Sequence, residues 1–129
     1  MKSYTDLEQS KMLLEILPLK SADMRFGFSH RLDGRITGHY PMIGREPSMG
    51  TIPCWSLAAL LGVLPFHLIV NNQSYAFSMH KGLNKDGETY MLRYNVFNTD
   101  VCLCSTDYYN SPIDSCYEMI LKLHELKML

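Results

Sequence analysis

One apolar segment, residues 52–65, constrains the fold of this chain more than any other part of its sequence. The segment IPCWSLAALLGVLP holds the only tryptophan, Trp55, and has a proline near each end. The Ser56 hydroxyl can cap a helix, and Gly62 and Pro65 are typical of the place where a helix stops. The helix predicted for 56–64 is apolar almost all the way round, so it needs cover on both sides, and we expect it deep in the core.

The length and composition are those of one globular domain. Of the 129 residues, 47% are hydrophobic and 19% are charged, and a chain of this length removes roughly two thirds of its unfolded surface from water. We therefore predict a single domain over residues 1–129. Twelve basic and thirteen acidic side chains leave a net charge of -1. This balance does not indicate the clustered basic surface that a phosphate backbone requires.

One local group of basic side chains departs from this balance. The group lies within a single predicted hairpin and consists of Arg25, His30, Arg31, Arg35 and His39. A solvated hairpin surface is the more common explanation of such a group, and a local binding patch is the alternative. We do not expect nucleic acid to be the main partner.

The remaining patterns predict an α+β fold. A capping box at 5–8 begins a helix that Pro18 ends, and Ser111 followed by Pro112 begins a last helix running to about residue 127. Alternation of apolar and polar residues predicts strands at 24–31, 35–43, 67–70, 74–80, 89–97 and 101–105. Turn signals join several of them as hairpins (Asp33-Gly34, Asn71-Asn72 and 84–87). We therefore expect an antiparallel sheet of about four to six strands, with three helices packed mainly on one face.

Targeting signals are not evident in the sequence. The N-terminal residues lack the basic-then-apolar layout of a signal peptide, and no window approaches the roughly 18 apolar residues that span a bilayer. We expect a cytoplasmic protein without membrane association. The four cysteines are then expected to be reduced, and to pack as small apolar residues.

Cys102 and Cys104 are the best candidates for metal ligands. Residues two apart on a strand project to the same face, so both thiols could reach one ion. A structural zinc site needs four ligands, and no second close pair is evident to complete it. Two buried small residues on a strand explain the pair adequately, and we predict neither a metal nor a cofactor.

Cys54 is the candidate for a reactive thiol. It comes just before a predicted helix, whose dipole can lower the pKa of a thiol. The sequence places no histidine base beside it, and a cysteine packed next to Trp55 is the favoured interpretation. The motifs GxxxxGK[ST], GxGxxG, HExxH and GxSxG are all missing. We therefore assign no catalytic residue.

Aromatic residues on the predicted strands allow a different idea. An exposed sheet could use such side chains to stack nucleic-acid bases. The residues concerned are Phe26, Phe28, Tyr75, Phe77, Tyr90 and Tyr94. Base stacking normally adds a basic groove, which the near-neutral charge does not indicate, so a core face is the preferred interpretation.

Three segments resemble short uncharacterised proteins of gut anaerobes and of their phages and mobile elements. The segments are LEILP at 14–18, IPCWSLAALL at 52–61 and PIDSCYEMI at 112–120. The resemblance covers the predicted helices, and the Pro-Cys-Trp-Ser part is its most specific feature. Because the family has no known activity, the resemblance implies no site residue.

Two classes of function follow from these observations, with a third as a further alternative. The preferred hypothesis is a non-enzymatic interaction module, an accessory protein of phage or mobile-element origin that acts on a host or phage protein. The alternative is a small cysteine-dependent enzyme or ligand-binding domain that uses Cys54 or the Cys102/Cys104 pair. The second alternative is a nucleic-acid-binding accessory protein. The sequence leaves the oligomeric state open.

Overall fold

The computed structural model describes residues 2–30, 32–33, 35–44 and 51–129, and the α+β class is confirmed there. Within these residues the strands divide between two antiparallel sheets, where the sequence predicts one. The helices are α1 (Leu7–Ile16), α2 (Leu57–Val63) and α3 (Pro112–Glu125), with a 3-10 turn η1 (Leu19–Ser21). The strands are β1 (Met24–His30), β2 (Ile36–Ile43), β3 (Ile52–Cys54), β4 (His67–Val70), β5 (Gln73–Asn84), β6 (Gly87–Asn95) and β7 (Cys102–Ser105).

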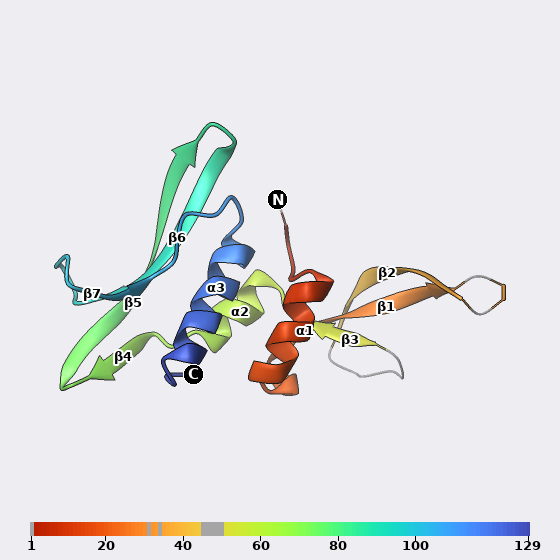
Figure 1. Ribbon diagram of the computed structural model, residues 1–129, viewed down its shortest axis with the longest axis horizontal. Helices are drawn as coiled ribbons and strands as arrows, with labels where there is room; N and C mark the ends of the chain where they lie inside the picture. Colours follow the sequence, from red (N-terminus) through yellow and green to blue (C-terminus); the bar gives the residue numbers. More distant parts are fainter. Residues whose placement is uncertain (1, 31, 34, 45–50) are drawn as a thin grey trace.

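The helices lie between the two sheets. Figure 1 shows the four-stranded sheet, in the order β4-β5-β6-β7, at one end of the molecule and the three-stranded sheet, in the order β2-β1-β3, at the other. Helix α3 packs against β6, α2 packs against α3, and α1 packs against β3. Each sheet therefore packs against a helix that lies in the middle of the molecule.

A single cluster of buried apolar side chains joins these elements. Trp55 at its centre has an exposed fraction of 0%. Its other members come from α1, α2, β4, β6, α3 and the turn before β1: Leu13, Leu17, Ala22, Leu60, Leu64, Leu68, Leu92, Tyr94, Ile113, Cys116, Met119, Ile120 and Leu123. The cluster draws on both halves of the chain, so neither sheet has a separate core of comparable size.

Hydrogen bonds fix Trp55 in this cluster. The Thr5 amide donates to the Trp55 carbonyl at 2.9 Å, and the Trp55 amide donates to Thr5 Oγ1 at 3.1 Å. The indole Nε1 donates to Ser21 Oγ at 2.9 Å. A buried indole or amide without a partner would cost free energy, so these contacts make complete burial of the tryptophan possible.

The helix ends mostly follow the predicted capping residues. Ser56 caps α2 and accepts from the Ala59 amide, and Ser111 caps α3 with Pro112 in the first turn. For α1 the predicted capping box is displaced by one residue, because Asp6 is the cap and Gln9 completes the box. Thr5 lies outside the helix, where its hydroxyl is within 2.8 Å of Ser10 Oγ.

The depth predicted for α2 is only partly correct. Leu60 is fully buried, whereas Leu61 is 37% exposed and Ala58 is exposed. The helix is short and packs against α3 and η1.

One strand, β3, was not predicted from the sequence pattern. Strand β3 has only three residues and begins the segment that leads into Trp55. Strand β5 extends to Asn84, beyond the predicted end at residue 80. The turn Asn71-Asn72 is confirmed, since both residues have positive φ, while Gly34 of the predicted turn Asp33-Gly34 lies outside the described residues.

The aromatic residues of the strands lie mostly in the core. Tyr94, Tyr75 and Phe77 belong to or pack against the buried cluster, and Tyr90 is also buried. Phe26 is buried with its ring centroid 5.9 Å from that of Tyr4, and the Phe28 side chain lies outside the described part. The described rings therefore do not form an exposed platform for base stacking.

The Thr5 hydroxyl is expected to contribute strongly to stability. Replacing Thr5 by valine removes the acceptor for the Trp55 amide, and leaving a buried donor unpaired costs about 1–3 kcal/mol. Urea denaturation of the Thr5→Val variant should show a loss of this size. Thr89→Val is the matched control, because Thr89 is also buried and its hydroxyl makes no hydrogen bond in the described part of the chain. Equal losses in both variants would contradict a specific role for the Thr5 hydroxyl.

Candidate functional site

Cys54, the candidate reactive thiol, lies in the core beside Trp55. Its exposed fraction is 0%. Burial, with a smaller contribution from the negative charge of Asp23, raises the pKa of the Cys54 thiol to about 11. The thiol is therefore protonated at neutral pH and has no access to solvent, which is the opposite of what a nucleophilic cysteine needs.

Cys102 and Cys104 do not share one face of β7. The pairing of β7 with β6 contains a register shift, which places Cys104 opposite Tyr94 and Cys102 opposite Asn95. Tyr94 and Asn95 are neighbours on β6 and project to opposite faces of the sheet. The same-face geometry on which the metal interpretation depended is therefore missing.

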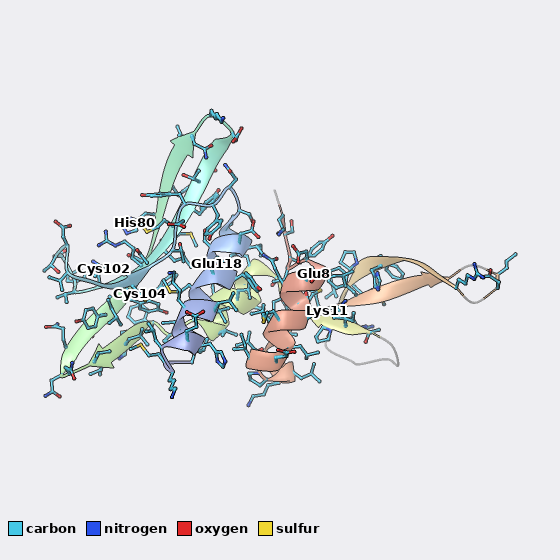
Figure 2. All side chains as sticks on the ribbon, in the orientation of Figure 1. Glu8, Lys11, His80, Cys102, Cys104 and Glu118 are labelled. Atoms are coloured by element: carbon cyan, nitrogen blue, oxygen red, sulfur yellow. The ribbon has the colours of Figure 1, made fainter. Side chains whose placement is uncertain are left out.

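The surroundings of the two thiols also differ. Cys104 Sγ lies 3.8 Å from Met119 Sδ of α3, whereas Cys102 is exposed and its thiol donates to the Cys104 carbonyl at 3.3 Å (Figure 2). Within the described ranges, no group of three or more His, Cys, Asp or Glu side chains is placed to hold a metal ion.

A polar hollow of about 390 Å³ lies on β5 beside the end of β6 and the loop that follows it. Ser78 Oγ is 3.0 Å from His80 Nε2 and donates to Asn95 Oδ1 at 3.2 Å. Ser78 Oγ therefore contacts both Asn95 and the imidazole, and the tautomer of His80 decides which of the two residues donates across the 3.0 Å contact. The group is a set of mutually satisfied polar side chains at the surface.

Sequence reasoning missed this group for a structural reason. Ser78 and His80 are two apart on one strand, and that spacing is visible in the sequence. Asn95 joins them only through the register that pairs Ala76 with Asn95 and Ser78 with Arg93. Local sequence patterns do not specify that register.

The β1–β2 hairpin forms an arm that projects from the body of the molecule. Within the described residues, β3 pairs with residues 24–26 of β1, while the pairing of β1 with β2 continues to His30 and Ile36. Figure 1 shows this arm pointing away from the helices. We call residues 24–44 the arm.

The side chains of Tyr40 and Met42 pack over Gly27 on one face of the arm. Gly27 lies opposite Tyr40, and a Cβ atom at Gly27 would lie 2.8 Å from both Tyr40 Cζ and Met42 Sδ. The two larger side chains therefore occupy the space that a side chain at position 27 would need. This contact adds packing to a pair of strands whose outer part has no third strand beside it among the residues that the structure describes.

The basic residues of the arm do not form one cluster. Arg25 lies near the base, with Nη1 close to Gly44, and its buried Nε atom has no hydrogen-bond partner in the described part. Arg35 lies near the tip, is 78% exposed and is 3.7 Å from Asp33 Oδ2. His39 is exposed, whereas Arg31 and the His30 side chain lie outside the described residues. The two described arginines therefore lie at opposite ends of the arm, and Arg35 is accompanied by Asp33.

Comparisons of the chain with protein-family models, with curated proteins and with solved structures find no match. Among the described residues, no helix is both long enough and apolar enough to cross a membrane.

Thiol labelling should distinguish the exposed Cys102 from the buried Cys54 and Cys116. At neutral pH we expect a thiol probe to modify Cys102 rapidly and to leave Cys54 and Cys116 unmodified until the protein unfolds, because burial raises the pKa of both. Peptide mass spectrometry of the native and denatured protein measures this. A Cys102→Ser variant is the control, and rapid native labelling of Cys54 would restore the cysteine-dependent hypothesis.

Gly27→Ala should weaken the arm without unfolding the core. The added methyl group must displace Tyr40 or Met42, and overpacking of this kind costs about 1–3 kcal/mol. Hydrogen exchange should accelerate in β1 and β2 and remain unchanged in α3. Gly38→Ala is the matched control on the neighbouring strand, because a Cβ there meets no atom within 4 Å. If the two variants exchange alike, the packing over Gly27 does not stabilise the arm.

Proposed function

We propose that this chain is a non-enzymatic interaction module that binds another protein through its arm. The observation that carries the proposal is the extension of β1 and β2 beyond β3. A two-stranded hairpin is at best marginally stable in water, so the outer part of the arm adds little to folding. The described side chains of Leu32 and Arg35 near its tip are exposed and can contact a partner.

The charge of the arm supports a partner with an acidic surface. Residues 24–44 contain three arginines and one aspartate, so the net charge of -1 divides into +2 in the arm and -3 in the rest of the chain. A positive arm on a negative body orients the molecule toward an acidic partner and speeds productive encounters.

The exposed residues of the arm favour a protein over a nucleic acid. Ile43 is 88% exposed, and Tyr40 is 44% exposed next to the exposed Pro41. Aromatic and apolar residues flanked by arginine are typical of protein interfaces. Sustained binding to a phosphate backbone commonly uses about 6–10 phosphate contacts, more than the three arginines of the arm provide.

The origin of the module remains a prediction that rests on the sequence resemblance. A phage or mobile-element protein would act on a host or phage protein in the cytoplasm. The position of its gene inside a phage or conjugative cassette would support this assignment. A chromosomal neighbourhood without such genes would contradict it.

A comparative affinity experiment tests the role of the arm. The wild-type chain and a variant in which a short Asn-Gly turn replaces residues 27–40 are used in parallel to capture cross-linked proteins from the native host. We expect a reproducible partner with the wild-type chain and none with the shortened chain. Recovery of the same partner by both would contradict the proposal.

Charge reversal refines the same experiment. Arg35→Glu should weaken binding of the captured partner severalfold, because it reverses an exposed charge of the arm that steers association. Lys85→Glu makes the same change at the exposed turn between β5 and β6 and should leave binding unchanged. A salt-dependent gel shift with DNA that is lost in the shortened chain would instead assign the arm to nucleic acid.

A further inference from the structure

Strand β5 has an open edge along its second half. Strand β4 pairs only with residues 73–76, and the last contact on that side is the Phe77 amide donating to the Phe66 carbonyl at 3.0 Å. The pairing of β5 with β6 on the other side continues to Asn84 and Gly87. In the described part of the chain, no strand lies beside residues 79–84 on the β4 side.

The backbone groups at this edge follow from strand alternation. Because the Phe77 amide points toward the β4 side, the backbone groups of Met79, Lys81 and Leu83 point the same way. The residues between them bond to β6. Three residues therefore present unpaired donors and acceptors in the geometry that a further strand requires.

The side chains at this edge of β5 do not protect it from pairing with a further strand. Lysine commonly protects a strand edge, but the Lys81 ammonium is 3.5 Å from Glu88 Oε2 and 5.6 Å from the ring centroid of Tyr90. Both partners are on β6, so the charge is turned away from the open edge. Leu83 at the same edge is 82% exposed and lines a hollow of about 350 Å³ with Lys81, Gly82 and Glu88.

We propose that a second copy of this chain pairs with this edge, β5 against β5, antiparallel about a two-fold axis at Lys81. This register places Met79 opposite Leu83 of the second copy and Lys81 opposite its own counterpart. The backbone groups of Met79, Lys81 and Leu83 then all form hydrogen bonds across the contact. The Met79 side chain of one copy covers the exposed Leu83 side chain of the other.

Neighbouring registers do not satisfy the edge as well. An axis at His80 places Leu83 opposite Phe77 of the second copy, whose amide is already bonded to Phe66. An axis at Gly82 places Met79 opposite Lys85 in the hairpin turn. Only the axis at Lys81 pairs each of Met79, Lys81 and Leu83, whose backbone groups point toward the open edge, with one of the same three residues in the second copy.

A second copy fits this edge better than a flexible peptide does. Its β5 is already held in the extended conformation by β6, so pairing does not incur the entropy cost of ordering a free chain. A two-fold contact also closes this part of the β5 edge in both copies at once, so the same edge cannot add further copies.

Sedimentation velocity tests the proposal on the protein alone. We expect a monomer–dimer equilibrium that shifts toward the dimer as protein concentration rises. Leu83→Pro removes an amide that points away from β6, so it leaves the hairpin hydrogen bonds in place and blocks pairing. It should weaken dimerisation by about tenfold or more, since one hydrogen bond is lost from each copy.

The matched control keeps the amide. Leu83→Ala removes the same side chain but retains the donor, so it should weaken the dimer less than proline does. Circular dichroism must show that both variants are folded. A wild-type chain that stays monomeric up to millimolar concentration, or a dimer that Leu83→Pro leaves unchanged, would overturn the proposal.

Disulfide trapping gives a second readout that does not depend on the proline variant. In a Cys102→Ser background, Lys81→Cys places two thiols directly opposite each other across the axis, with Cα atoms about 5.5 Å apart. Mild oxidation should give a covalent dimer. Asn84→Cys is displaced from the axis and should not cross-link, so equal cross-linking at both positions would contradict this register.

Discussion

The burial of Trp55 depends on a few hydrogen bonds that join three separate parts of the chain. The indole donates to Ser21, the Trp55 backbone exchanges hydrogen bonds with Thr5, and Asp23 accepts from both the amide and the hydroxyl of Ser56. The N-terminal segment, the turn before β1 and the start of α2 therefore meet at one point. Trp55 also belongs to the buried cluster that the three helices share with the four-stranded sheet, so the packing of these elements depends on this point.

Features encoded by neighbouring residues could be predicted from the sequence. Ser56 and Ser111 cap their helices because the cap needs only a hydroxyl at the right place and an amide three or fewer residues away. The period-two pattern of Tyr75, Phe77 and Met79 correctly indicated one face against the core. The division into two sheets could not be predicted, because it depends on β3 pairing with β1, from which it is separated in the chain by β2.

The properties of the candidate sites also could not be predicted from neighbouring residues, because they depend on strand register and burial. The spacing of Cys102 and Cys104 indicates a shared face only for a regular strand, and the register shift in β7 removes that regularity. The reactivity suggested for Cys54 by its place before a helix is outweighed by complete burial. The arm could be predicted as a hairpin, but its projection beyond β3 is visible only when the length of the third strand is known.

The direct continuation of β3 into Trp55 also affects how the arm can move. No loop separates Cys54 at the end of β3 from the buried indole. Because β3 holds the base of β1, the arm cannot rotate as a rigid body without disturbing Trp55 and its hydrogen bonds. A partner bound to the arm as we propose would therefore keep a defined orientation relative to the four-stranded sheet.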